Sequence, residues 1–357
     1  MLNPEENIEL KNFTTFKIGG PARYFFRVRN LDEAREAFGF ARLKRLPHFV
    51  LGGGSNLLAS DEGFHGVIIK NELFGVSFTE AGDEEVEAVA GAGENWDAFV
   101  AESVRRGFYG LENLSGIPGT VGAAPIQNIG AYGAEVKDAI VSVEAIDSRT
   151  GALKAFTNAD CRFAYRDSFF KTPEGKPFIV TAVRFRLKKS GVLNTEYKDL
   201  KNHFASAPKK NRALTLKTVR QAVLEIRRGK FPDLETCGTA GSFFKNPIIS
   251  RQQFDDLKKQ FPDLPGFPLD ADSRGFQADS RGKNTPRVKV SLAWILDNVC
   301  ELKGYQKGSM ALFERQPIVA VNTGGASAED AKRLAQEVAA RVKEKTGIEV
   351  EWEVERL

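Results

Sequence analysis

The sequence predicts a mixed α and β protein, and three observations support that prediction. Apolar strand-like runs alternate with amphipathic helical runs over the first half of the chain. Residues 22–56 read as strand, helix and strand in that order, which is typical of a β-α-β unit with parallel strands. The chain ends in a helical pattern over 327–347, followed by an alternating segment over 348–357. With 357 residues, two or three domains are expected.

The N-terminal half supplies most of the predicted strands. Residues 22–30 predict a strand, and Asn30 with Glu33 three residues later predicts the capped start of a helix over 31–46. The next strand runs into glycines at 48–56. Similar runs predict strands at 66–70, 85–93, 139–147 and 178–189, and a helix at 95–107.

The polar segment 201–215 interrupts the strand pattern and predicts a domain boundary. A helix is expected over 214–230, because Val219, Val223 and Ile226 recur at helical spacing. Further patterns predict a helix at 291–300, a strand at 317–322, a helix at 327–347 and a half-buried strand at 348–357. The repeated "ADSRG" within 271–282 predicts an inserted surface loop.

The composition excludes several classes of function. The three cysteines and three histidines stand at no metal-ligand spacing, which argues against a zinc site, a disulfide framework and a Ser-His-Asp hydrolase. No apolar run is long enough to span a bilayer, and the N-terminus has no signal-peptide pattern. With 51 basic and 47 acidic residues, the charge is too mild to argue for nucleic acid. A cytoplasmic protein without a metal is therefore expected.

Two glycine-rich segments raise the question of a phosphate site. The first, "LGGGSN" at 51–56, follows a strand but opens no helix, so a dinucleotide fingerprint of the Rossmann type fails. It is either a plain turn or a nest of backbone N–H groups that binds phosphate. The second segment, 110–133, holds six glycines, two prolines and one charge, Glu112. It is either an irregular buried crossover or a dry groove for a flat ligand.

Three polar residues are candidates for chemistry, each with an ordinary alternative. Arg166 is either in a salt bridge, for example with Asp167, or a fixed cation that faces a carboxylate or enolate. Ser242 is either a turn serine or a proton donor, and no histidine stands in a position to make it a nucleophile. Glu353 lies among similar glutamates and reads locally as solvated.

A basic run follows the predicted domain boundary and contains one acid, Glu225. It is either a solvated helix face or a wall that binds a diphosphate, and a nucleic-acid arm is disfavoured because no aromatic residues accompany the charges. Its eight cations are Lys209, Lys210, Arg212, Lys217, Arg220, Arg227, Arg228 and Lys230.

Taken together, these motifs resemble the UDP-N-acetylenolpyruvoylglucosamine reductase family, a flavin enzyme of bacterial peptidoglycan synthesis. The resemblance is collinear over nearly the whole chain, and its subfamily is the one with a substrate-covering tyrosine loop. The motifs that carry it are "NFTTFKIGGPARYF", "LGGGSNLL", "AGAGENW", "GLENLSGIPGTVGAAPIQNIGAYG", "CRFAYRDSFFK", "GSFFKNP" and "ELKG".

The resemblance implies an α+β fold in which a two-subdomain FAD-binding unit of the vanillyl-alcohol-oxidase (PCMH) type precedes a C-terminal α+β substrate-binding domain. The expected divisions are 1–70 and 71–207 for FAD and 208–357 for the UDP-sugar, with the terminal strand returning Glu353 to the active site. The positions expected to bind FAD are Gly52, Gly53, Gly54, Ser55, Asn56, Ile117, Pro118, Gly119, Gly122, Ala123, Asn128, Ile129, Gly130 and Ile179.

The resemblance also implies a reaction in two halves. NADPH reduces the flavin and leaves, and a hydride then passes from flavin N5 to C3 of the enolpyruvyl ether while C2 is protonated. The family's catalytic residues fall on Arg166, Ser242 (the proton donor) and Glu353. Its substrate-binding positions fall on Tyr197, Lys230, Asn246 and Gln316, and a monomer with no nucleic-acid partner is expected.

The sequence departs from the family pattern at its end, where Trp352 and Glu355 replace the usual proline and arginine. Two competing functions stay open at this point. One is a different flavin oxidase or dehydrogenase on the same scaffold, and the other is a non-catalytic nucleotide- or nucleic-acid-binding protein. If glycine is needed for cofactor approach, Gly122→Val or Gly130→Val should reduce FAD binding before it reduces folding.

Overall fold

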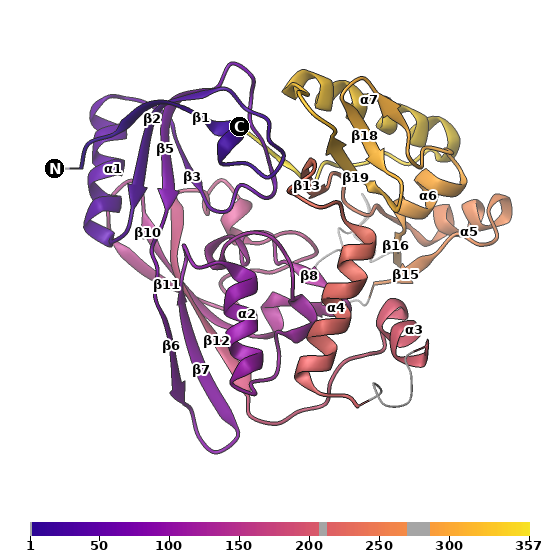
Figure 1. Ribbon diagram of the computed structural model, residues 1–357, viewed down its shortest axis with the longest axis horizontal. Helices are drawn as coiled ribbons and strands as arrows, with labels where there is room; N and C mark the ends of the chain where they lie inside the picture. The colour runs from indigo at the N-terminus through magenta and orange to yellow at the C-terminus, as the bar shows by residue number, and fades with distance from the viewer. Residues whose placement is uncertain (1, 207–212, 270–285) are drawn as a thin grey trace. The chain divides into compact units, whose positions relative to one another are not determined.

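Two compact units make up the chain in the computed structural model, which describes residues 2–206, 213–269 and 286–357 (Figure 1). The first unit comprises 1–8, 22–53 and 64–229, and the second comprises 9–21, 54–63 and 230–357. The sequence did not indicate that two short N-terminal segments belong with the C-terminal residues. The predicted insertion at 271–282 and the cations Lys209, Lys210 and Arg212 lie outside the described residues.

The first sheet of the first unit contains the predicted β-α-β unit. Strands β2 (Pro21–Val28) and β3 (His48–Leu51) both pair in parallel with β5 (Phe64–Asn71), and β1 (Glu5–Glu9) forms the other edge. Helix α1 (Leu31–Leu43) connects β2 to β3 and buries Ala34, Ala37, Phe38 and Ala41. Asn30 caps it by accepting a hydrogen bond from the Glu33 N–H, as predicted.

The second sheet of this unit is antiparallel, in the order β11-β10-β12-β7-β6. Helix α2 (Trp96–Arg105) packs on it through Trp96 and Phe99, both of which contact Phe185. Strands β7 (Glu85–Gly91), β10 (Ile140–Asp147) and β12 (Phe178–Lys188) were predicted. The edge strands β6 (Val76–Glu80) and β11 (Leu153–Thr157) were missed, because each is exposed at most positions and lacks the alternation of a half-buried strand.

Short elements and two further helices complete the first unit. Part of the predicted polar break at 201–215 is helical, because α3 (Lys198–Ser206) extends into it, while α4 (Leu216–Lys230) forms as expected. The remaining elements are the two-residue strands β8 (Gly130–Ala131) and β9 (Ala134–Glu135) and the 3-10 turns η2 (Glu112–Leu114), η3 (Val121–Ala123), η4 (Val136–Asp138) and η5 (Phe169–Lys171).

The second unit has two antiparallel sheets around one hydrophobic core. The larger sheet has the order β13-β19-β18-β17, with α6 (Leu292–Asn298) packed on β19 and α7 (Ala328–Thr346) packed on β18. The smaller sheet has the order β14-β16-β15, with α5 (Arg251–Gln260) beside it. Its strands are β13 (Gly238–Ser242), β14 (Ile248–Ser250), β15 (Gly266–Pro268), β16 (Arg287–Val290), β17 (Gln306–Lys307), β18 (Met310–Phe313) and β19 (Gln316–Asn322).

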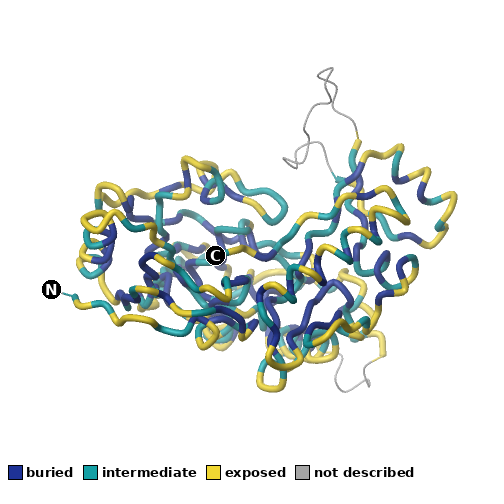
Figure 2. Tube along the Cα trace, turned by 90° about the horizontal axis from the view of Figure 1, so that it is seen from above, coloured by how far each residue is buried: buried dark blue, intermediate teal, exposed yellow. Residues whose placement is uncertain are grey.

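The predicted strand at 348–357 is wrong in its extent. Only β20 (Glu355–Arg356) forms, in parallel with β4 (Leu57–Leu58), and Leu357 exchanges backbone hydrogen bonds with the chain at Leu58 and Ser60. Ile348 and Val354 are buried while Glu349 and Glu351 are exposed, so the burial pattern holds without a continuous ladder. Figure 2 shows buried, intermediate and exposed positions along the whole trace.

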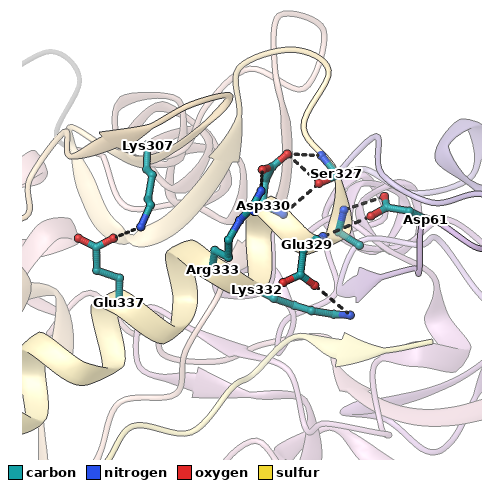
Figure 3. Close-up of polar contacts among 9 residues, drawn as sticks. Asp61, Lys307, Ser327, Glu329, Asp330, Lys332, Arg333 and Glu337 are labelled. Atoms are coloured by element: carbon teal, nitrogen blue, oxygen red, sulfur yellow. Dashed lines mark hydrogen bonds and ion pairs between the residues drawn. The ribbon is translucent and has the colours of Figure 1, made fainter.

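The N-terminus of α7 is capped twice. Ser327 and Asp330 form a capping box, and the Asp61 carboxylate accepts hydrogen bonds from the N–H groups of Ala328 (2.7 Å) and Glu329 (3.3 Å). Figure 3 shows Asp61 directed at these backbone groups. Because the first N–H groups of a helix have no partner within it, Asp61 also places its negative charge where the helix dipole favours one.

We expect Asp61→Ala to lower the free energy of unfolding by about 1 kcal/mol, because it removes a cap and a charge that complements the helix dipole. Urea unfolding of the purified protein measures this change. Asp256→Ala is the matched control, since Asp256 forms an exposed ion pair with Lys259 and should change the stability little. Equal effects of the two substitutions would contradict the capping role.

Candidate functional site

The two glycine-rich segments meet within the first unit. Gly52 and Gly53 follow β3, and a Cβ on Gly52 would lie 2.7 Å from the Thr120 hydroxyl oxygen. A Cβ on Gly53 would lie 2.7 Å from the Cα of Gly119. The atom near Gly52 belongs to a side chain, but the atom near Gly53 is backbone, so glycine is required at position 53 for the two backbones to touch. The structure therefore joins two segments that the sequence analysis could only name separately.

Several backbone N–H groups have no hydrogen-bond acceptor among the described residues where these two turns meet. The N–H groups of Gly53, Gly119 and Thr120 donate to no residue in the parts of the chain that the structure describes. Meanwhile Gly119 O and Glu94 O accept from Trp96 and Val121, at 3.1 Å and 2.9 Å, which fixes the second turn. Backbone N–H groups without an acceptor are the donors that a phosphate nest requires. These unused donors favour the phosphate-nest interpretation over a plain turn.

A lysine from the neighbouring strand supports the first turn. The ammonium group of Lys70, on β5, donates a hydrogen bond to the Gly52 carbonyl oxygen. Burial lowers the pKa of Lys70, with a smaller opposing effect from Glu72. The sequence analysis did not single out Lys70, because a lysine at the end of an apolar strand gives no local sign of its partner.

The second half of the first turn belongs to the second unit. Gly54 has a positive φ of 62°, and a Cβ there would lie 1.9 Å from the Phe13 carbonyl oxygen. The Asn56 side-chain amide donates to the carbonyl oxygen of Glu353 (3.1 Å), and the Asn56 carbonyl accepts from the Glu355 N–H (3.1 Å). Asn56 therefore holds the terminal segment that carries one of the predicted catalytic residues.

A backbone hydrogen bond in the second unit brings the Glu353 backbone next to the residue that follows Ser242. The Glu353 N–H donates to the carbonyl oxygen of Phe243 at 2.9 Å, directly after Ser242 at the end of β13. The Ser242 hydroxyl is half-buried and bonds to no described residue. Trp352, which replaces the family's proline, packs its ring 4.7 Å from that of Phe243. The departure at 352 thus adds an apolar contact beside the serine.

Arg166 lies in the first unit on a backbone with a positive φ of 52°. Its guanidinium donates to the carbonyl oxygens of Gly130 (2.8 Å) and Asn128 (3.4 Å), both in the second glycine-rich segment. The ring of Tyr165 lies 5.4 Å from the guanidinium carbon. Two main-chain carbonyl oxygens therefore hold the guanidinium beside the second glycine-rich segment.

The apolar spacers of the segment are packed into the protein. Ile129 is buried, and Ile117 lies half-buried against the core beneath α2. Ile179, on β12, packs against the core beneath α1. Ala123 ends η3, whose turn also contains Gly122. Because these side chains fill the interior, they support the turn whether or not they also touch a cofactor.

Gly122 is required by the protein itself. A Cβ there would lie 2.5 Å from the Ala92 Cβ, and the Gly122 N–H donates to the Ala92 carbonyl at 2.9 Å. The expectation that Gly122→Val reduces FAD binding before folding is therefore revised. At Gly130 a Cβ would lie 3.0 Å from the Ala134 carbonyl oxygen and 3.2 Å from Arg166 Nη1, so bulk at that position would press on both the backbone and the guanidinium.

Helix α4 holds the second glycine-rich segment through two of its cations. Arg227 Nε donates to the Gly116 carbonyl (2.9 Å), and the Gly116 N–H donates to Asp97 (2.6 Å). Arg220 in turn makes two hydrogen bonds to the Asp97 carboxylate, at 2.6 Å and 2.9 Å. Burial opposes the change, but these bonds hold the pKa of Asp97 below its ordinary value. Part of the predicted basic wall is thus used inside the unit.

The predicted substrate-binding positions are distributed over both units. Tyr197 of the first unit contacts Tyr132 edge to face, with ring centres 5.5 Å apart. In the second unit, Lys230 ends α4 and Gln316 begins β19. The Asn246 side-chain oxygen accepts from the Leu292 N–H at 3.0 Å, at the start of α6. Lys230 and Gln316 therefore stand at the ends of elements, and Asn246 is fixed by its bond to the start of a helix.

Two negative observations complete the description. Over the ranges 2–206, 213–269 and 286–357, no three side chains of the types that bind metals gather in one place. No helix in these ranges is long and apolar enough to cross a membrane.

Burial raises the pKa of the Cys161 thiol to about 12, so this cysteine is an unreactive core residue.

Both halves of the chain match known families. Residues 22–157 match a family model described as an FAD binding domain, and residues 232–357 match one described as the C-terminal domain of UDP-N-acetylenolpyruvoylglucosamine reductase. The reductase of Chromobacterium violaceum is 39% identical over 348 residues, which cover 97% of each chain. The chain belongs to the UDP-N-acetylenolpyruvoylglucosamine reductase family. The reductase of Bdellovibrio bacteriovorus, 40% identical over 345 residues and 97% of each chain, agrees.

A solved member of the reductase family supports the fold. The crystal structure of the enzyme from Thermus caldophilus aligns with a TM-score of 0.65 at 26% identity, covering 100% of this chain and 99% of that one. The predicted family, fold class, enzyme class and FAD cofactor are therefore confirmed. The subfamily and the role of each site residue stay predictions.

We expect Lys70→Met to weaken FAD binding about tenfold, because it removes a charge-assisted hydrogen bond from the Gly52 carbonyl and a cation beside the turn. Flavin fluorescence during titration of the apoprotein measures the dissociation constant. Lys258→Met is the matched control, since Lys258 also donates to a single backbone carbonyl, that of Pro262, on an exposed helix. Unchanged FAD affinity in Lys70→Met would show that the cation serves only the fold.

We expect Gly122→Val to lower the free energy of unfolding of the apoprotein by about 1–3 kcal/mol, because the side chain would overlap Ala92. Urea unfolding without FAD measures the change. Gly39→Val is the control, since a Cβ on Gly39 would meet no atom within 4 Å. A variant with normal apoprotein stability and lost FAD would restore the original expectation.

Proposed function

We propose that the protein reduces UDP-N-acetylglucosamine enolpyruvate to UDP-N-acetylmuramate with NADPH, through FAD, in peptidoglycan synthesis. The observation that carries this proposal is that one chain joins an FAD-binding match over 22–157 to the reductase's own C-terminal match over 232–357. A flavoprotein with another substrate would not be expected to have the second match. Full-length identity of about 40% to reductases of distant bacteria agrees with it.

FAD, when bound, supplies the hydride transfer between NADPH and the enolpyruvyl group. The residues that would hold its diphosphate are those of the nest, with the N–H groups of Gly53, Gly119 and Thr120 as donors. The lysine at position 70 fixes the turn that presents the first of these donors. The two glycine turns are held in contact by the protein's own packing, so the donors are arranged before the cofactor arrives.

Arg166 and Glu353 would stabilise the enol-type intermediate, Arg166 through its positive charge, and Ser242 would donate the proton to C2. The guanidinium of Arg166 is held by two carbonyl oxygens of the second glycine-rich segment, and a cation fixed in this way can provide electrostatic stabilisation. Ser242 keeps its hydroxyl without a described partner, so its proton is not committed elsewhere. A serine is a weak acid, and it needs the strongly basic carbon of an enolate-like species to act as a donor.

The UDP-sugar would bind through Tyr197, Lys230, Asn246 and Gln316, with Tyr197 as the covering residue of the tyrosine-loop subfamily. Tyr197 is partly exposed, and its ring rests on Tyr132, so it can present a hydroxyl to a ligand without losing its support. Lys230 supplies a cation suited to a diphosphate. We further propose that the enzyme acts as a monomer in the cytoplasm, where UDP-linked precursors are made.

Two spectroscopic experiments test the proposal against other flavoenzymes. The purified protein should show the visible absorbance of FAD, and it should consume NADPH at a rate that rises sharply when UDP-N-acetylglucosamine enolpyruvate is added. A yellow protein whose NADPH consumption ignores this substrate would favour a different flavin oxidase or dehydrogenase. A protein that cannot take up FAD would contradict both.

We expect Ser242→Ala to slow the oxidation of reduced flavin by the enolpyruvyl substrate by about 10²–10⁴-fold, because it removes a general acid. Flavin reduction by NADPH should stay within about twofold of the native rate, since no proton donor to C2 is needed there. Stopped-flow absorbance separates the two half-reactions. Ser242→Cys retains a protic group of similar size and should recover part of the rate; equal slowing of both halves would argue against a proton-donor role.

A further inference from the structure

Asn128 is fully buried and has a positive φ of 45°. Its side-chain amide nitrogen donates to the Ala164 carbonyl and to a Glu135 carboxylate oxygen, both at 3.0 Å. Its side-chain oxygen accepts from the Lys137 N–H at 3.2 Å. Both donors of the amide and one acceptor site are therefore used within the protein. Asparagine is among the residues that tolerate a positive φ, so its backbone suits the position too.

One of these bonds ends on the turn that carries Arg166. The turn is closed by two backbone hydrogen bonds between Ala164 and Asp167, at 3.0 Å and 3.2 Å. Arg166 lies inside it on a positive φ, a conformation that costs a side-chain-bearing residue free energy and needs outside support. The Asn128 amide supplies that support, because the Ala164 carbonyl accepts from it as well as from Asp167.

The same asparagine also lies at the other end of the arginine. The Asn128 carbonyl and the Gly130 carbonyl accept from the two terminal nitrogens of the guanidinium. Asn128 thus contacts the turn before Arg166 through its side chain and the charged end of Arg166 through its backbone. One buried residue fixes both the origin and the end of a long, flexible side chain.

Aspartate would not replace asparagine here, although it has the same shape. The Glu135 carboxylate, which faces the amide nitrogen, already pairs with Lys137 Nζ at 2.7 Å. A second carboxylate in this place would oppose that of Glu135 and leave the Ala164 carbonyl without its donor. The requirement is therefore for an amide, and for one that donates twice.

We propose that Asn128 is a positioning residue that holds Arg166 in place for the reaction, and that it is not a cofactor ligand through its side chain. The proposal rests on the catalytic role proposed above for Arg166. It replaces the sequence-based expectation that Asn128 binds FAD, because both side-chain donors are already used inside the protein. The backbone of Asn128 is not part of this inference.

Two substitutions test the side chain separately from the backbone. Asn128→Gly accommodates the positive φ while removing all three side-chain hydrogen bonds, and Asn128→Asp retains the acceptor for Lys137 but removes both donors. We expect either change to slow the oxidation of reduced flavin by UDP-N-acetylglucosamine enolpyruvate by about 10²-fold, since a misplaced charge loses its orientation. Flavin reduction by NADPH and the FAD dissociation constant should stay within about twofold.

A double-mutant cycle shows whether Asn128 acts through Arg166. We expect Arg166→Ala alone to slow the second half-reaction, and Asn128→Gly to slow it no further in the Arg166→Ala background. Alanine at position 166 has the same positive φ cost as arginine, so the comparison isolates the guanidinium. The loss of thermal stability caused by Asn128→Gly should be equal in both backgrounds, which separates positioning from folding.

Asn71→Asp is the matched control for both substitutions. Asn71 is also buried in the first unit, donates to the Val180 carbonyl at 3.0 Å and accepts from the Leu73 N–H, but contacts nothing in the Arg166 turn. It should lower the melting temperature without selectively slowing the second half-reaction. If Arg166→Ala has no effect, the proposed role of Arg166 fails. The inference about Asn128 is wrong if Arg166→Ala slows the second half-reaction but Asn128→Gly does not. It is also wrong if the rate reductions of the two substitutions multiply in the double mutant.

Discussion

The contact between two glycine turns is the constraint on which the cofactor-binding part of the molecule depends. Gly53 and Gly119 let two backbones approach more closely than any side chain permits, and the N–H groups left over there face no acceptor from the described chain. Everything around the contact serves to keep it. Lys70 holds one turn, while Arg227 and Asp97 hold the peptide of Gly116 shortly before the other. Preorganised donors need little rearrangement when an anion binds.

The sequence predicted the elements whose burial follows a regular period. The strands at β7, β10 and β12 and the helices α1, α2, α4, α6 and α7 have one apolar face each, so their patterns are visible locally. The edge strands β6 and β11 lack such a face and were missed. Residues 348–354 alternate between buried and exposed positions as a strand does, but they pair only through isolated hydrogen bonds near Phe243. The predicted burial pattern was therefore correct, whereas the predicted strand was not.

The site could be named from motifs but not explained by them. The motifs that contain the glycines, Arg166, Ser242 and Glu353 identified the family correctly. The structural role of each residue, however, depends on partners far away in the sequence. Arg220 and Arg227 read as a solvated or ligand-binding face, whereas both hold the glycine-rich segment. A pattern of residue types carries no information about which carbonyl a given cation or amide will reach. That information appears only once the chain is folded.

The pairing of the chain's last described strand with β4 has a consequence for biosynthesis. Asn56 and Glu353 are 297 positions apart, and the strands beside them, β4 and β20, form a two-stranded sheet of their own. Contacts at such separation form late, because a long loop must close before they are gained. The second unit therefore cannot be completed on the ribosome until residue 355 has emerged, whereas residues 22–53 and 64–229 can fold earlier. Glu353, one of the predicted catalytic residues, therefore reaches its position only after the first unit has been synthesised.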